Sequence, residues 1–358
     1  MRRNWMLAAV SLTAAFSTSG CAAVLVGSAL PTLNSSPPGS SPAGRSSPQS
    51  KYGFEMSEAD RYLAESAEFV RSLDPCGFLT ERDLAALGTV VQLRPDGELS
   101  ACTADLATER STVTDSVTIE LDGLAPTNDD PDLEQLTIGS EQVYLNEISE
   151  GACRLSFPIR DEFDGSTSGP IEGLLTESGR SFAMIDVYRA DDDACNATKS
   201  IAETALGLLA DPPLRVDSKY NLPLASKDPC GVLAHLPATW EVDRWNPASD
   251  PYHCHFLASS SAFEDNLMML DITLDYVDSD MRSTNRESVQ HGGYTVETGG
   301  SESSCFADIV LGNPVLGMPQ KDDSAATYAR TTPRLSVTAD DCDSAVDLAV
   351  AAADHLTG

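Results

Sequence analysis

The sequence predicts an α+β protein of two similar domains, each an antiparallel sheet with an N-terminal and a C-terminal helix, stapled by disulfides. The stretch Asp-Pro-Cys-Gly-Phe-Leu at residues 74–79 recurs as Asp-Pro-Cys-Gly-Val-Leu at residues 228–233. Three more cysteines follow each copy, and equivalent cysteines lie 154, 152, 152 and 147 residues apart. Between them, apolar and polar residues alternate, which is typical of antiparallel strands with one wet face. A duplicated domain is the simplest explanation of both observations.

Length and charge limit the classes of partner. The 358 residues suit two domains of ordinary size. The formal net charge is −32, from 55 acidic and 23 basic residues. Such an acidic surface repels phosphate backbones, so nucleic acid is a poor candidate partner. The charge fits a solvated exterior, and the alternative is a surface that faces a basic partner or divalent cations.

The N-terminus reads as an export signal. Arg2 and Arg3 precede a short apolar run, and Thr-Ser-Gly leads into Cys21. The apolar run is too short to span a membrane. Residues 18–21 resemble a bacterial lipobox, although Thr18 stands where an aliphatic residue is usual. We therefore expect residues 1–20 to be a lipoprotein signal peptide and Cys21 to carry the lipid; the alternatives are ordinary secretion and twin-arginine export.

Residues 21–52 form a Ser- and Pro-rich segment after the signal peptide. Most of this segment has few large apolar side chains, so burial cannot offset the entropy of ordering it. We expect a disordered tether, in which about 25 residues of coil reach roughly 25 to 30 Å from the anchor. Its composition also permits O-glycosylation.

The first repeat, residues 53–211, is expected to begin with helices. Residues 57–73 predict a helix that packs on the first domain. Asp74-Pro75 has the character of a helix start, and a second helix follows that Thr80 caps and Gly88 ends.

Strands follow in the first repeat, and a helix closes it. The strands are predicted from inward-facing residues at alternate positions, namely Val117, Ile119 and Leu121; Cys153, Leu155, Phe157 and Ile159; and Phe182 with Met184. The acidic run at residues 191–193 is expected to cap the closing helix. Its apolar positions are Thr198, Ile201, Ala202, Ala205, Leu208 and Leu209.

The second repeat, residues 212–358, is expected to retrace this order after a stiff connector at residues 211–213. Its strands are predicted from Met268, Leu270, Ile272, Leu274 and Tyr276; from Cys305, Ala307, Ile309 and Leu311; and from Leu335 with Val337. Its closing helix begins at residues 340–342 and carries Val346, Ala349, Val350, Ala353 and Leu356. Each unit is therefore a layer of helices against one face of a sheet.

Nine cysteines divide into one near the N-terminus and four in each repeat. Even counts in an exported chain predict disulfides, and the absence of any Cys-x-x-Cys pair disfavours zinc. Four cysteines allow three connectivities, and spacing alone does not choose between them. We expect neighbours to pair: Cys76 with Cys102, Cys153 with Cys195, Cys230 with Cys254, and Cys305 with Cys342.

These residues carry a family resemblance. The lipobox, the Ser/Pro tether, the Asp-Pro-Cys start, a third cysteine that opens a strand, and the closing helices at Cys195 and Cys342 resemble the actinobacterial exported-lipoprotein domain of unknown function 3558. The resemblance covers roughly residues 70–358, as two copies. One departure is that Thr103-Ala104 and His255-Phe256 stand where a Trp often follows the second cysteine. The resemblance implies a cell-envelope lipoprotein and carries no established activity.

Catalytic and metal-binding patterns are weak. No histidine precedes His235, so the first repeat can host no histidine-based catalysis. Residues 253–255 read His-Cys-His, but side chains alternate between opposite faces of a strand and Cys254 belongs to the disulfide framework, so we expect a structural or surface role. Acidic runs at residues 129–132 and 191–193 lack the ligand spacing of a calcium loop. The Gly-rich run at 165–169 is not a nucleophile elbow.

We expect no catalytic, cofactor or metal residue. The most plausible contact aromatics are Trp240, Trp245 and Tyr252, although core packing is the favoured explanation of all three. The resulting hypothesis is a lipid-anchored, extracytoplasmic membrane protein, not an enzyme, that binds an envelope protein or a cell-wall component. The alternatives are a carrier that holds a lipid or other apolar ligand between sheet and helix, and a hydrolase that uses carboxylates alone.

Overall fold

The structure is a computed structural model. It describes residues 51–95, 99–107, 115–123, 133–159, 182–189, 193–220, 222–236, 240–246, 250–260, 267–278, 286–301, 304–313, 315–316 and 330–358. The signal peptide, Cys21, most of the tether, the acidic run at 129–132 and the Gly-rich run at 165–169 lie outside these ranges.

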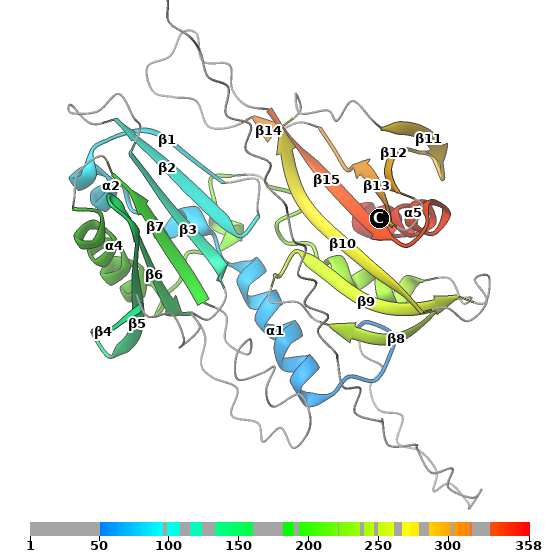
Figure 1. The fold of residues 1–358 in the computed structure, drawn as a ribbon, viewed down its shortest axis with the longest axis horizontal. Helices are drawn as coiled ribbons and strands as arrows, with labels where there is room; N and C mark the ends of the chain where they lie inside the picture. Colours follow the sequence, from blue (N-terminus) through cyan, green and yellow to red (C-terminus); the bar gives the residue numbers. More distant parts are fainter. Residues whose placement is uncertain are drawn as a thin grey trace, which may run out of the picture. The chain divides into compact units, whose positions relative to one another are not determined.

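Both repeats fold into antiparallel sheets with the same strand path (Figure 1). Across the first sheet the order is β1-β2-β3-β7-β6-β5-β4, and across the second it is β8-β9-β10-β15-β13-β12-β11, with the short β14 beside β15. Each strand of the first sheet thus has an equivalent at the same place in the second. The predicted fold class of two similar disulfide-stapled α+β domains is confirmed.

The strands have the following bounds. The first sheet contains β1 (Thr89–Pro95), β2 (Ala101–Ala107), β3 (Asp115–Gly123), β4 (Leu133–Ile138), β5 (Glu141–Ser149), β6 (Ala152–Pro158) and β7 (Phe182–Tyr188). The second contains β8 (Trp240–Asn246), β9 (His253–Ser260), β10 (Leu267–Asp278), β11 (Glu287–His291), β12 (Tyr294–Ser301), β13 (Ser304–Val310), β14 (Val315–Leu316) and β15 (Arg330–Ala339).

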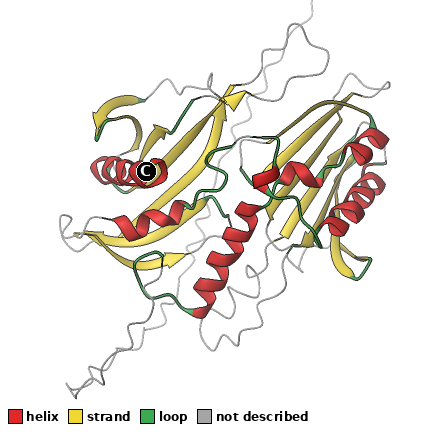
Figure 2. Cartoon of the chain, turned by 180° about the vertical axis from the view of Figure 1, so that it is seen from behind, coloured by secondary structure: helices red, strands yellow, loops and turns green. Residues whose placement is uncertain are grey.

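One long helix closes each repeat and covers one face of its sheet (Figures 1 and 2). Helix α4 (Ala194–Leu208) packs on β6 and β7, and α5 (Cys342–Thr357) packs on β13 and β15. Three residues of the predicted stripe on α5, Ala349, Ala353 and Leu356, are buried as predicted, whereas Val346 and Val350 are only partly buried. Its buried apolar residues are Ala345, Leu348, Ala349, Ala352, Ala353 and Leu356. Small alanines let the helix approach the sheet closely.

Strand β7 corrects a second prediction. The sequence predicted that Phe182 and Met184 face the core, but Met184 is half-exposed. The buried residues that face α4 include Ala183, Ile185 and Val187, one position away. Apart from Asp186, apolar residues occupy both faces of this strand, so the sequence pattern does not show which face is buried.

The helix caps are only partly as predicted. Thr80 caps α2 (Glu81–Leu87) by accepting from the Asp83 backbone N–H, as expected. Asp341 likewise caps α5 by accepting from the Ser344 N–H. Asp193 occupies the N-cap position of α4 but makes no side-chain cap bond, because its carboxylate accepts from the Asn196 side-chain amide instead.

Helix α1 (Glu58–Ser72) contacts both repeats, although the sequence predicted packing on the first. Ser57 and Asp60 form a capping box at its start. Ala64, together with Tyr52 from the preceding segment, is buried in the core of the second repeat. Val70 is buried in the core of the first. Tyr52 is only 2% exposed. The last residue of the predicted disordered tether is therefore packed in the folded part of the protein.

Four disulfides join neighbouring cysteines in the predicted scheme. Cys76–Cys102 and Cys230–Cys254 attach the short 3₁₀ helices η1 (Pro75–Phe78) and η3 (Pro229–His235) to β2 and β9. Cys153–Cys195 and Cys305–Cys342 attach α4 and α5 to β6 and β13. The repeated Asp-Pro start has one role in both copies, because Asp74 and Asp228 accept from the Cys76 and Cys230 N–H groups.

The glycine after each of these cysteines allows close packing. A Cβ on Gly77 would lie 2.3 Å from the ring of Pro213. Pro213 comes two residues before the short 3₁₀ helix η2 (Arg215–Asp217). A Cβ on Gly231 would lie 2.4 Å from the end of the His355 side chain. The Pro213 ring cannot rotate away, whereas an imidazole can.

We expect Gly77→Ala to lower the free energy of unfolding by about 1–3 kcal/mol, and Gly231→Ala to cost less. Urea unfolding measures both. Gly207 in α4 has no atom within 4 Å of an added Cβ, so Gly207→Ala is the matched control and should stabilise by about 0.5–1 kcal/mol. A Gly77→Ala variant as stable as the unaltered protein would contradict the close packing.

Candidate functional site

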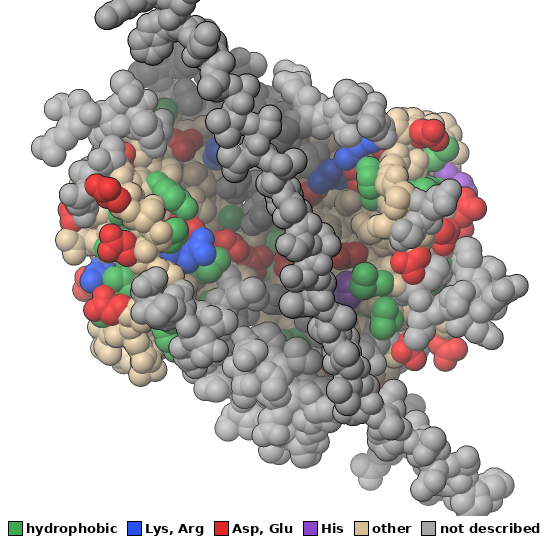
Figure 3. Space-filling model, in the orientation of Figure 1, with side chains coloured by type: hydrophobic (Ala, Val, Ile, Leu, Met, Phe, Trp, Pro, Cys, Tyr) green, Lys and Arg blue, Asp and Glu red, His purple; other side chains and the backbone are tan. Residues whose placement is uncertain are grey.

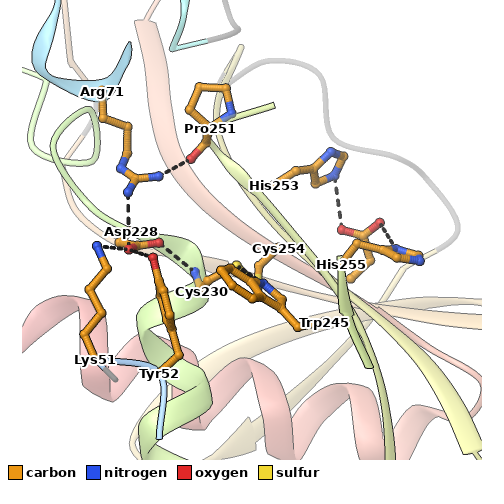
Figure 4. Close-up of a disulfide and its surroundings, with 11 residues drawn as sticks. Lys51, Tyr52, Arg71, Asp228, Cys230, Trp245, Pro251, His253, Cys254 and His255 are labelled. Carbon is orange, nitrogen blue, oxygen red and sulfur yellow. Dashed lines mark hydrogen bonds and ion pairs between the residues drawn. A yellow bond between two sulfur atoms is a disulfide. The ribbon is translucent and has the colours of Figure 1, made fainter. Parts of the chain in front are cut away.

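The chain just before α1 is fastened to the second repeat by a group that we call the clasp, formed by Lys51, Tyr52, Arg71 and Asp228 (Figure 4). The Tyr52 hydroxyl donates to Asp228 Oδ2 at 2.8 Å. Lys51 Nζ and Arg71 Nη2 each lie 3.2 Å from the same oxygen. The Asp228 carboxylate thus binds two cations and a phenol, all from residues that precede it in the chain by at least 157 positions.

The clasp changes the ionisation of two of its members. Burial and the neighbouring Asp228 charge raise the pKa of Tyr52 to about 12, so the phenol stays a hydrogen-bond donor at neutral pH. Burial opposes the charge on Lys51, but its hydrogen bond to Glu68 and the Asp228 carboxylate outweigh burial and raise its pKa. Both groups therefore remain in the state that binds Asp228.

Further bonds join the two repeats around the turn at residues 250–252, which we call the junction turn. Arg71 Nη1 donates to the Pro251 carbonyl at 2.7 Å. Arg215, the first residue of η2, donates to the Leu99 carbonyl at 2.6 Å and to the Tyr252 hydroxyl at 3.2 Å. The connector is also held to the start of the first repeat, because the Asp74 N–H donates to the Pro213 carbonyl.

Beside the junction turn, two histidines flank one carboxylate on the sheet of the second repeat (Figure 4). His253 and His255 on β9 share a face, and β10 pairs Asp271 with His255. His253 Nε2 lies 3.2 Å from Asp271 Oδ1, and His255 Nδ1 lies 3.6 Å from Asp271 Oδ2. Cys254 points to the opposite face, into its disulfide.

The carboxylates around His253 favour its protonated form. His253 Nδ1 lies 3.4 Å from Asp250 Oδ2, so a carboxylate lies near each of its ring nitrogens. The hydrogen bond to Asp250 outweighs burial and, with the Asp271 charge, raises the pKa of His253. Within the described ranges, no group of three or more His, Cys, Asp or Glu residues is placed to hold a metal ion.

Asp122, at the end of β3 in the first repeat, is the most perturbed carboxyl group near the junction turn. Ser100 donates to its Oδ2 at 2.7 Å, whereas Oδ1 is buried and no donor among the described residues reaches it. Burial, then the nearby Asp250 charge, raises the pKa of Asp122 to about 8. The protonated form of this carboxyl group is therefore favoured over that of an ordinary aspartate, which the sequence alone does not show.

The first repeat carries different residues at the positions equivalent to the histidines. Cys102 and Cys254 are equivalent, so Ala101 and Thr103 stand where the second repeat has His253 and His255. Thr103 contacts Thr118 on β3 through their hydroxyls at 3.0 Å, where the second repeat has His255 beside Asp271. The histidine group therefore occurs in the second copy of the duplicated scaffold and not in the first.

The aromatic residues singled out in the sequence pack in the core. The Trp245 indole packs against the Tyr52 ring in a tilted arrangement, with ring centroids 4.7 Å apart, and donates to Cys230 Sγ at 3.1 Å. Tyr252 is buried, and its hydroxyl donates to the Ala225 carbonyl. Trp240 packs against the same core. Tyr252 is therefore fully enclosed, whereas Trp240 and Trp245 each keep part of their surface exposed.

Charged groups also occupy the uncovered face of the second sheet. Arg334 pairs with Asp275 and Asp308, and Arg286 pairs with Asp308 and Glu297. Bonding to Asp275 outweighs burial and raises the pKa of Arg334. The carboxylates neutralise both arginines, so this network joins strands rather than offering an anion site.

Figure 3 shows that Asp and Glu side chains predominate over Lys and Arg on the described surface of that view. This agrees with the net charge of −32. Among the described helices, none combines the length and apolar character that crossing a membrane requires.

Comparisons with known proteins identify no relative of this chain. No family model, curated protein or solved structure matches it.

Proposed function

We propose that the protein is a lipid-anchored protein of the cell envelope, held at the extracytoplasmic face by Cys21, whose two repeats bind a protein or cell-wall partner without catalysing a reaction. The observation that carries the proposal is the set of four disulfides, which repeat in both copies and persist only where thiols are oxidised. The resemblance to actinobacterial exported lipoproteins points to the same location.

A binding role also fits the way the two repeats are joined. Buried Arg71 and Arg215 of η2 bond to residues on both sides of the junction turn, and the clasp adds Lys51 and Tyr52. A partner therefore meets one connected surface rather than two domains on a loose linker. Because that surface is strongly acidic, we expect a partner with a basic face.

Capture from envelope extracts tests the proposal. The bait is the chain from Pro48 onward, which forms one compact unit and keeps Lys51. We expect a saturable partner that binds at low salt and is released near 0.5 M salt, since screening weakens contacts between exposed charges. Bait reduced and alkylated at its eight repeat cysteines is the control. Equal capture by folded and reduced bait would reject a folded binding module.

The two alternatives differ in their support. The first alternative, a carrier of a lipid or apolar ligand between sheet and helix, has little support. Residues such as Ile185 and Ala202 fill that space and are fully buried. A carboxylate hydrolase has one feature in its favour, which is that burial and the Asp250 charge raise the pKa of Asp122. Hydrolysis of a glycoside or ester substrate that Asp122→Asn abolishes would support that alternative.

A further inference from the structure

The four disulfides fall into two classes by exposure, and the same division occurs in both repeats. In the bonds that hold the short 3₁₀ helices, both cysteines are at most 5% exposed. These bonds are Cys76–Cys102 and Cys230–Cys254. In the bonds that hold the closing helices α4 and α5, the strand cysteine is fully buried but the helix cysteine is not. Cys195 of α4 is half-buried, and Cys342 of α5 is exposed.

Packing protects the first class from reagents in solution. The Trp245 indole donates to Cys230 Sγ at 3.1 Å and lies beside that disulfide (Figure 4). In the first repeat, Gly77 follows Cys76 and packs so closely on Pro213 that an added Cβ would not fit between them. A thiol must reach a sulfur atom directly in order to attack it. These two bonds are therefore protected while the fold is closed.

The start of α4 gives access to the second class. Cys195 lines an open cavity of about 290 Å³, which is large enough for a small thiol. Glu147 and Glu150, both exposed, line the same cavity from β5 and from the turn that follows it. The two carboxylates attract a cationic reagent and repel an anionic one.

The start of α5 has the same character in the second repeat. Cys342 is exposed as the first residue of the helix, and Asp341 and Asp343 flank it in the sequence. Both copies therefore combine one accessible cysteine, one fully buried partner and neighbouring carboxylates.

We propose that the disulfides of the two closing helices are sites of thiol–disulfide exchange and that a cationic thiol is their preferred reagent. A thiolate attacks Sγ of Cys195 or Cys342 and forms a mixed disulfide with it. The buried strand cysteine, Cys153 or Cys305, leaves as a thiolate and takes up a proton. A second reagent thiol then attacks the mixed disulfide and frees the helix cysteine. In total, one protein disulfide is reduced and two reagent thiols are oxidised to a disulfide.

Timed reaction of the full-length protein with cysteamine in detergent tests the proposal. Samples are quenched with an alkylating reagent, and peptide mapping follows each bond. We expect the two closing-helix bonds to open about tenfold or more faster than the two protected bonds. In concentrated urea, which removes the difference in exposure, all four should open at similar rates. Equal rates in the folded protein would overturn the proposal, and so would earlier opening of either protected bond.

The two repeats provide a matched control for the choice of reagent. At low salt, cysteamine should open the Cys153–Cys195 bond about threefold or more faster than anionic 2-mercaptoethanesulfonate, relative to the same ratio in urea. Replacing both cavity carboxylates, by Glu147→Gln and Glu150→Gln, should abolish this preference at Cys195 and leave it unchanged at Cys342. The unchanged reaction at Cys342 also shows that the variant is folded. A preference that survives at Cys195, or that disappears at both helices, would overturn the assignment of a cationic reagent.

Discussion

Removing both disulfides of the first repeat, by changing Cys76, Cys102, Cys153 and Cys195 to alanine, is expected to cost about 7 kcal/mol of unfolding free energy. The bonds close loops of 26 and 42 residues. Loop-closure entropy gives about 3 to 4 kcal/mol for each. The total rivals the net stability of a small domain, about 5–15 kcal/mol, so this repeat should be largely unfolded at 37 °C.

The second repeat offers the matched comparison. Its bonds close loops of 24 and 37 residues, so replacing Cys230, Cys254, Cys305 and Cys342 should cost nearly the same. Circular dichroism during urea unfolding measures both variants. A loss below about 1 kcal/mol in either would show that the disulfides do not stabilise the repeats, since typical bonds contribute 2–4 kcal/mol.

Arg71→Ala is expected to lower the unfolding free energy by about 3–5 kcal/mol, because it breaks a largely buried ion pair. Only 6% of the Arg71 side chain is exposed. The guanidinium contacts Asp228 and the Pro251 carbonyl, and both lose a charged partner in the variant. Lys51 still neutralises part of the Asp228 charge, which limits the loss.

Urea unfolding of matched variants separates this effect from general damage to a helix. Arg82 is exposed on α2, so Arg82→Ala should change stability by about 0.5 kcal/mol or less. Asp228→Asn keeps the oxygen that accepts from the Cys230 N–H but removes the charge. The double variant should cost less than the sum of the two single losses, because the residues interact directly. Strict additivity would contradict the clasp.

Much of the fold was predictable because its determinants are local or periodic. Cysteine spacing revealed the duplication, and alternation located β3, β6, β10 and β13. On α5 the prediction was correct for Ala349, Ala353 and Leu356 but placed the partly buried Val346 and Val350 in the core in place of Leu348 and Ala352, because apolar residues extend around much of this helix. The prediction of which face of β7 is buried was wrong for a related reason, since apolar residues occupy nearly every position from Phe182 to Val187.

The clasp and the junction were not predictable, because they depend on partners far apart in the chain. Tyr52 and Asp228 are separated by 176 residues. Asp122 is one of 55 acidic residues, and only burial beside Asp250 distinguishes it from the others. The histidines carried a usable signal, because His253 and His255, two positions apart, must share one face of a strand.

The central claim is that eight cysteines form an oxidised, doubled scaffold outside the cell and that Cys21 is acylated. The most direct test is the intact mass of the protein isolated from membranes without reductant, before and after treatment with a thiol-alkylating reagent. We predict a chain that begins at a lipid-modified Cys21 and gains no alkyl group until it is reduced, when it gains eight. Alkylation of the repeat cysteines without reduction would contradict the claim.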